Sequence, residues 1–385
     1  MDRIREFYMV NSKACEELDV NVIKTGLCTL CGACVGNCPY LAAYEGRVLL
    51  KDICDLPQGR CEAACPRISL DLDHLSRVTF GTPYAEDDLG TVRRVVMART
   101  TDSKIRARAQ DGGAVTALMK FAMEEGFIDS AILTSFEDKS WPRGIVACSG
   151  EQILKCSGSS YLAAPTIESF NQVIQNPNHQ SIGFVGTPCQ VMALVKMRTA
   201  PAEISQDMDK LKLVVGLFCT WALAYPDFGR FLEKRISDPV VRYEVPPHPA
   251  NVLSAYTENE RFSFSIEEVL PFVRPACRFC LDLTAEFADL SVGGGRGEVL
   301  NWNTVIVRTE KGMRLLDSAI QKGVIEMAPI PEENLSRLKA AAYNKKKRAI
   351  ENIIQRTGST DDLLYLKGRP GIVKRLVAEC REGSL

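Results

Sequence analysis

The sequence contains little histidine and no long apolar run. Only three of its 385 residues are histidine, which makes an imidazole-based catalytic triad or a zinc hydrolase a poor explanation. No segment is apolar over the length needed to cross a bilayer, and the N-terminal segment lacks the apolar core of a signal peptide. The net charge of −1 offers no general positive field for nucleic acid. We therefore expect a cytoplasmic protein without a membrane span.

Cysteine, in contrast, is abundant. In a chain without an export signal, 15 cysteines indicate metal ligation in a reducing compartment rather than disulfides. The densest stretch, residues 28–39, reads C-x2-C-x2-C-x3-C-P, which is the run of bacterial ferredoxins. Three thiolates of such a run hold one cubane, and the fourth reaches a second cluster. A zinc site would normally stop at two CxxC pairs. The run therefore predicts a ferredoxin-like iron–sulfur module.

A second set of cysteines follows, but it is incomplete. In a two-cluster ferredoxin the last Cys-Pro returns its cysteine to the first cluster. The first cluster would then be held by Cys28, Cys31, Cys34 and Cys65. The second would be held by Cys38, Cys54 and Cys61, one thiolate short. The alternatives are a non-cysteine ligand near Pro57 or Gln58, a three-iron cluster, Cys15 reaching in, or a half without metal.

The rest of the chain alternates between strand-like and helix-like segments. We expect a module at 1–75, a polar linker at 76–95, an α/β core with a mixed sheet at 96–330 and a helical region at 331–385. Strands are expected at 131–134, 181–186, 211–218 and 304–308. An amphipathic helix is expected from Ala114, with Asp111 as a candidate cap. The basic run 345–348 is typical of a solvated helix face; the alternative is a basic rim for an anionic cofactor tail.

Two turns in the core are candidate ligand contacts. Gly112 and Gly113 precede the helix at 114, where open backbone N–H groups can bind phosphate, although a plain turn and cap explains them equally well. The strand at 181–186 leads directly into Thr187-Pro-Cys-Gln190 and a helix, which places these residues at the edge of a sheet. The glycine stretch 293–297 lacks G-x-G-x-x-G spacing, so a nicotinamide site is not supported.

Several motifs in order resemble one known family. They are Gln-Asp-Gly-Gly (110–113), Gly-Ser-x-Tyr (158–161), Gly-Thr-Pro-Cys-Gln (186–190), Gly-Leu-Phe-Cys (216–219), CxxC (277–280) and Ala-Asp-Leu-Ser-Val-Gly-Gly (288–294). From about residue 25 to about 350 the chain resembles the beta subunit of the coenzyme F420 hydrogenase/dehydrogenase family. Its N-terminal cysteines make it similar to members with a ferredoxin module, such as the beta subunit of F420-dependent formate dehydrogenase.

The resemblance implies FAD in the α/β core and an additional [4Fe–4S] cluster there, giving two to three clusters in the chain. The cluster ligands it implies are Cys189, Cys219, Cys277 and Cys280. Residues implied to bind FAD phosphate are Gly112, Gly113 and Thr116, and those implied near the flavin ring or ribityl chain are Ser159, Tyr161, Thr187 and Gln190. Many relatives carry lysine where this chain has Ser160, so a cation that could help to bind an anionic deazaflavin is missing there.

The function implied is that of an F420-dependent oxidoreductase subunit. Hydride would pass between coenzyme F420 and FAD, and single electrons would pass through [4Fe–4S] clusters to a partner subunit, in either direction. The partner would be of the formate dehydrogenase, hydrogenase or heterodisulfide reductase type. Two alternatives stay open, which are a relay or adaptor subunit without F420, and a family member that uses another donor such as ferredoxin or NAD(P)H.

Overall fold

The computed structural model describes residues 14–36, 38–136, 141–202, 205–246, 250–295 and 299–382. Residues 1–13 of the expected module, 296–297 of the glycine stretch and 383–385 of the expected helical region lie outside these ranges. Within them, no helix is both long enough and apolar enough to cross a membrane.

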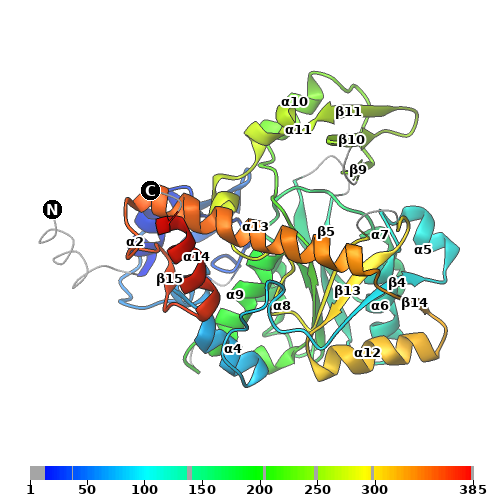
Figure 1. Cartoon of the computed structure of the whole chain (residues 1–385), viewed down its shortest axis with the longest axis horizontal. Helices are drawn as coiled ribbons and strands as arrows, with labels where there is room; N and C mark the ends of the chain where they lie inside the picture. Colours follow the sequence, from blue (N-terminus) through cyan, green and yellow to red (C-terminus); the bar gives the residue numbers. More distant parts are fainter. Residues whose placement is uncertain are drawn as a thin grey trace, which may run out of the picture.

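A mixed sheet of eight strands forms the centre of the chain (Figure 1). The strand order is β14-β4-β13-β12-β8-β7-β5-β6, and the neighbours β12, β8, β7 and β5 are parallel. The strands are β4 (Arg94–Thr100), β5 (Ser130–Ser135), β6 (Arg143–Ala147), β7 (Ile182–Gly186), β8 (Leu211–Leu217), β12 (Leu290–Gly294), β13 (Asn303–Val307) and β14 (Ile325–Pro329). All four strands expected from the sequence are present, and the mixed α/β core is confirmed.

Helices cover both faces of this sheet. Alternate residues of β5 serve opposite faces, since Ala131 and Leu133 belong to one apolar core and Ile132 belongs to another. This explains the continuous apolar runs of the parallel strands. The helices on the first face are α5 (Ser103–Arg108), α6 (Ala114–Glu124), α7 (Gly150–Lys155) and α12 (Glu310–Gln321). Those on the other face are α8 (Thr166–Val173) and α9 (Pro188–Thr199).

A small second sheet lies above one edge of the large sheet (Figure 1). It has its own apolar core, which includes Phe228, Tyr243 and Leu253. Its strands are β9 (Arg242–Glu244), β10 (Val252–Tyr256) and β11 (Arg261–Ser265), accompanied by α10 (Asp227–Glu233) and α11 (Ile266–Val269). The short 3-10 segments η3 (Leu270–Phe272) and η4 (Pro275–Phe279) then return the chain to the large sheet.

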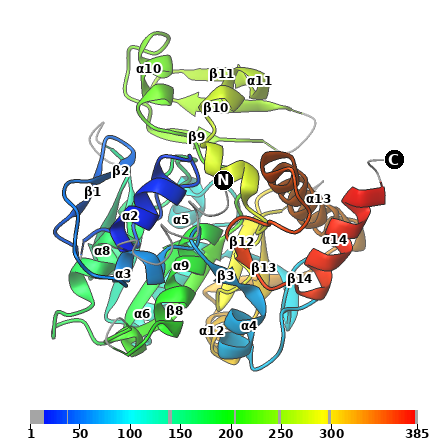
Figure 2. The ribbon, with the colours of Figure 1, turned by 90° about the vertical axis from the view of Figure 1, so that its left-hand side faces the viewer.

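The cysteine-dense N-terminal segment packs against the second face of the sheet, beside α8 and α9 (Figure 2). Its elements are α2 (Ala14–Leu18), the π-helical turn η1 (Asp19–Ile23), β1 (Leu41–Tyr44), β2 (Arg47–Leu50), α3 (Arg60–Ala64), β3 (Leu70–Asp71) and α4 (Leu72–Phe80). The Asn171 amide of α8 donates to the backbone oxygens of Ala33 (3.1 Å) and Val35 (2.7 Å). At Gly32, a Cβ would lie 2.5 Å from the Pro165 oxygen, so only glycine allows this close approach. The segment therefore shares its core with the α/β unit.

The C-terminal region is helical, as expected, with α13 (Glu332–Thr357) crossing the front of the molecule in Figure 1 and α14 (Gly371–Glu382) packed against it. Between them β15 (Leu366–Lys367) pairs with β3. The prediction of a solvated face for the basic run 345–348 is wrong for two of its members. Lys345 and Lys346 are only 4% and 0% exposed, and Lys346 pairs with the buried Glu286. Glu286 is distant in sequence, so the run alone could not reveal its partner.

Candidate flavin and iron–sulfur site

A cavity of about 1110 Å³ opens at the carboxyl ends of the parallel strands. Leu133 and Thr134 of β5, Val185 and Gly186 of β7 and Leu217 of β8 all contribute to its wall. The ends of parallel strands are where open α/β sheets bind ligands, because the loops that follow them diverge there. The cavity is large even for a small-molecule site, and it suits a dinucleotide-sized ligand.

The first wall of the cavity is the start of α6. Gly113 is the residue that caps this helix, and its φ of +72° suits glycine. The cap prediction for Asp111 is wrong, because no side chain caps α6. The Asp111 carboxyl instead faces the cavity, and burial, followed by the charge of Glu244, raises its pKa to about 6. Thr116 also lines the cavity, and the N-terminus of this 11-residue helix is a suitable anion site.

Gly112 has a different place from the one the resemblance implies. It packs against β4, where an added Cβ would lie 2.8 Å from the Ala98 oxygen and 2.9 Å from the Asn303 nitrogen. Its carbonyl oxygen accepts from the Thr100 N–H at 2.8 Å. The structure therefore supplies a packing reason for this glycine, and it is Gly113 that faces the cavity.

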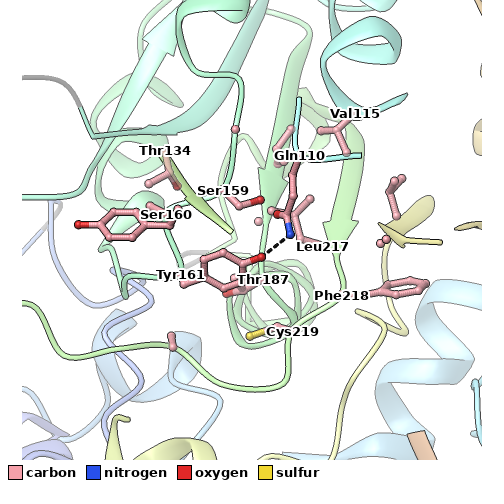
Figure 3. A pocket seen from close by; sticks show the side chains of 18 of the residues that line it. Gln110, Val115, Thr134, Ser159, Ser160, Tyr161, Thr187, Leu217, Phe218 and Cys219 are labelled. Atoms are coloured by element: carbon pink, nitrogen blue, oxygen red, sulfur yellow. Dashed lines mark hydrogen bonds between the residues drawn. The ribbon is translucent and has the colours of Figure 1, made fainter. Parts of the chain in front are cut away.

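The second wall is the loop 157–161, which includes Ser159 and Tyr161. Tyr161 has a left-handed backbone (φ 56°), and its hydroxyl accepts hydrogen bonds from the Gln110 amide and from the Val245 N–H (3.2 Å). Figure 3 shows the Gln110–Tyr161 pair among the lining residues. Burial is the main reason that the pKa of Tyr161 is raised to about 12, so the phenol stays neutral. The pair ties the loop to the start of α6.

The third wall is the β7–α9 turn. The Gln190 side chain accepts from the Thr187 N–H at 2.8 Å and donates to the Ala164 oxygen and the Thr166 hydroxyl, each at 3.0 Å. Gln190 is thus fully engaged in fixing the turn, although it also lines the cavity. The Thr187 hydroxyl lies 3.3 Å from the sulfur of Cys189, so the same turn aims a thiol at the cavity.

The four scattered cysteines implied by the resemblance all line this one cavity. Cys189 lies in the first turn of α9, Cys219 follows β8, and Cys277 and Cys280 belong to η4 and its end. Burial raises the pKa of the Cys219 thiol, and the charges of Cys277, Cys189 and Cys280 raise it further. The Cys277 sulfur accepts from the Ala222 N–H at 3.4 Å. The donor set is therefore four thiols with mutual electrostatic contact, which suits an iron–sulfur cluster.

Two buried cations accompany these thiols, and sequence reasoning did not identify them as part of the site. The Lys345 ammonium donates to the Cys219 oxygen, and the Arg67 guanidinium donates to the Phe279 oxygen at 3.1 Å. Burial acts to lower the pKa of both groups, but the thiolates of Cys280 and Cys277 act in the opposite direction, and the net pKa of each is raised. The Arg67 Nε is buried without a hydrogen-bond partner among the described residues. An anionic cluster would accept from such a donor.

The described parts of the chain contain no group of three or more cysteine, histidine or acidic side chains arranged for a single metal ion. A cubane carries one iron at each of four corners, so it spreads its thiolates farther apart than one ion does. The relevant observation is therefore which thiols share one electrostatic environment.

The N-terminal cysteines form two such groups. Burial raises the pKa of Cys34, and Cys31, Cys28 and Cys65 are the next largest causes. The pKa of Cys61 is raised to about 12, by burial first and then by Cys38, Cys54 and Cys15. The grouping expected from the ferredoxin pattern is therefore reproduced, with Cys15 added to the incomplete set.

The N-terminal and core groups are also neighbours. After burial, the largest cause of the raised pKa of Cys31 is the core cysteine Cys189, and Cys61 contributes to that of Cys34. The three groups therefore form a series from the cavity through the core cysteines to the N-terminal segment.

Comparison with known proteins gives a consistent family. The description "Coenzyme F420 hydrogenase/dehydrogenase, beta subunit" matches this chain twice, with its N-terminal part at residues 95–171 and its C-terminal part at residues 179–333. The coenzyme F420 hydrogenase subunit beta of Methanothermobacter thermautotrophicus is 31% identical over 70% of this chain and 96% of its own length. A coenzyme F420-dependent sulfite reductase of Methanocaldococcus jannaschii is 28% identical over 84% of this chain and 51% of its own length.

A solved structure agrees with these sequence matches. A chain in the xenon-derivatised F420-reducing [NiFe] hydrogenase complex of Methanosarcina barkeri is 30% identical, with a TM-score of 0.65. The match covers 71% of this chain and 96% of that chain. The N-terminal segment and most of α13 and α14 lie outside both matched family regions.

Proposed function

Because the chain belongs to the coenzyme F420 hydrogenase/dehydrogenase beta subunit family, we propose that it is the flavin and iron–sulfur subunit of an F420-linked redox complex. It would exchange hydride between coenzyme F420 and bound FAD and relay single electrons to a partner subunit. The observation that carries the proposal is one cavity that joins a helix N-terminus, a polar loop and four thiols.

Each wall of the cavity has a chemical task in this proposal. Gly113 and Thr116 at the start of α6 would bind the FAD phosphates, while Ser159, Tyr161 and Thr187 would orient the flavin. Bound FAD supplies the conversion between a two-electron hydride carrier and one-electron carriers. Tyr161 stays neutral and Gln190 is held by its own hydrogen bonds, so both serve to fix the walls rather than to move protons.

Positive charge for the anionic deazaflavin comes from residues other than 160. Arg108 at the end of α5 and Lys155 at the end of α7 both line the cavity. A cation near the mouth of the cavity attracts an anionic ligand over several ångströms. We propose that these two side chains take the place of the lysine that many relatives carry at the Ser160 position.

The electron path is proposed from the series of thiol groups. The core group Cys189, Cys219, Cys277 and Cys280 would hold the additional [4Fe–4S] cluster, and Cys28, Cys31, Cys34 and Cys65 would hold the first cluster of the ferredoxin-like module. In this proposal residues 1–75 are the module, 76–95 the linker, 96–330 the FAD-binding core and 331–385 the C-terminal helical region. The exposed side chains of Ile53 and Leu56 beside Cys54 suit the contact with a partner subunit.

The test is anaerobic mixing of the FAD- and iron-reconstituted protein with reduced F420, with NADH in a parallel run. Reduced F420 alone should bleach the flavin. A matched pair, Arg108→Gln and the distant Arg235→Gln, tests the binding of the anionic donor. We expect Arg108→Gln to raise the apparent Kd for F420 about tenfold, with no change for Arg235→Gln. Bleaching by NADH alone, or by neither donor with clusters present, would contradict the proposal.

A further inference from the structure

The second cysteine group of the N-terminal segment lacks a ligand in its own sequence motif. The position where that ligand belongs is near Pro57 and Gln58. Both residues are exposed in the structure. The turn between Cys54 and Cys61 therefore presents these side chains to solvent, where neither can complete a buried cluster.

Cys15 is placed where the missing ligand is needed. It lies on α2 and is only 1% exposed. The Ala14 N–H donates to the Leu56 oxygen at 3.1 Å, so the start of α2 is fastened to the 54–61 turn. A Cβ added to Gly59 would lie 3.4 Å from the Ala14 Cβ and 3.5 Å from the Cys61 sulfur. Cys15 and Cys61 thus approach the same point from two different helices, α2 and α3.

The Cys15 sulfur also contacts Cys54 directly. It accepts a hydrogen bond from the Cys54 N–H at 3.2 Å and lies 3.7 Å from the Cys54 oxygen. Backbone N–H donors to sulfur stabilise thiolate ligands and tune cluster potentials. Burial and the thiolate of Cys54 raise the pKa of Cys15, while the backbone donor of Cys54 lowers it. A buried thiol in this setting would gain from binding iron, which replaces its proton.

We propose that Cys15 is the fourth ligand of a second [4Fe–4S] cluster in the N-terminal segment, together with Cys38, Cys54 and Cys61. The inference rests on the proposed iron–sulfur function of this segment. Assembly is not a redox step for the protein, because four Cys thiols lose their protons to solvent and bind iron supplied with sulfide. The residue lies 13 positions before Cys28, outside the ferredoxin run, and it reaches the site only because α2 folds back over α3.

The test compares Cys15→Ala with the wild-type chain after anaerobic reconstitution with ferrous iron, sulfide and FAD. The wild type should bind about twelve irons, and Cys15→Ala should lose up to about four of them or convert one cluster to a three-iron form with its own EPR signal. Cys54→Ala should show the same loss, and the double variant should lose no more than Cys54→Ala. The exposed Cys148→Ala is the matched control and should keep all the iron.

A cavity in a small helix is the alternative cause of iron loss in Cys15→Ala. Cys15→Ser keeps the side-chain volume and should still change the second cluster, with FAD content and the thermal unfolding temperature unchanged. Iron content and EPR spectra equal to wild type in both Cys15 variants, or a wild-type chain that binds only about eight irons, would overturn the inference. Failure of the proposed function is distinguishable, because it appears as no flavin bleaching by reduced F420 in the wild type, whatever the iron content.

Discussion

The charge of Lys345 should raise the reduction potential of the proposed core cluster. Lys345 is 4% exposed, and its ammonium group donates to the backbone oxygen of the ligand Cys219. Reduction adds negative charge to the cluster, so a nearby buried cation favours the reduced state. Removing that cation in Lys345→Met should therefore lower the potential.

The size of the effect follows from Coulomb's law. At a separation of about 7 Å and an effective dielectric constant of about 20, one unit charge contributes roughly 2 kcal/mol. For a one-electron step this corresponds to about 100 mV. Lys347→Met is the matched control, because it removes the same charge from the same helix at a side chain that is 40% exposed and lies 3.9 Å from Glu379. Solvent and salt should reduce that shift to about 10 mV.

The assay is an EPR-monitored redox titration of the reconstituted variants. The core-cluster signal is identified by its loss in Cys189→Ala. A downward shift of about 100 mV in Lys345→Met, with little change in Lys347→Met, is the expected result. Equal shifts in the two lysine variants, or an unchanged potential in Lys345→Met, would refute the placement of this charge beside the cluster.

Three further outcomes follow from the structure. Gly113→Ala forces a side chain into a φ of +72° and within 3.0 Å of the Thr100 methyl carbon, so it should cost about 1–2 kcal/mol in chemical denaturation and weaken FAD binding in a fluorescence titration. If it leaves both unchanged, the assignment of this helix start fails. Asp111→Asn should stabilise the FAD-free chain above pH 6 and not below pH 4, by up to about 3 kcal/mol, because a pKa raised to about 6 means that ionisation opposes folding as the pH rises through this window. Thermal unfolding across pH checks this, and a pH-independent difference would contradict it. Lys346→Met leaves Glu286 buried without its cation and should cost about 3–5 kcal/mol in chemical denaturation, while Lys346→Met combined with Glu286→Leu should recover part of the loss. A double variant as unstable as the single one would argue against the pair.

The core elements could be predicted from the sequence because their signals are local. The apolar runs at 181–186 and 211–218 became β7 and β8, and the periodic stretch after Gly113 became α6. Spacing alone could not join Cys189 and Cys219 to the CxxC at 277–280, because their proximity depends on the sheet order. The family resemblance supplied that grouping, and the cavity is lined by all four residues.

Features that depend on distant partners escaped sequence reasoning. Lys345 and Lys346 belong to a run that resembles a solvated face, but their partners Cys219 and Glu286 lie more than 50 residues away. Asp111 has the residue type of a helix cap, yet the left-handed Gly113 begins the helix instead. Cys15 was one of several options for the incomplete second motif. Only the fold of α2 over α3 distinguishes it from the exposed Gln58.

The central claim is that hydride enters at the flavin and leaves as single electrons through the core cluster. Stopped-flow mixing with reduced F420, with flavin and iron–sulfur absorbance followed together, tests it most directly in the wild type and in Cys219→Ala. We predict flavin bleaching followed by cluster bleaching in the wild type, and flavin bleaching without the subsequent electron transfer in Cys219→Ala. Cluster bleaching that precedes flavin bleaching, or that survives unchanged in Cys219→Ala, would contradict the account.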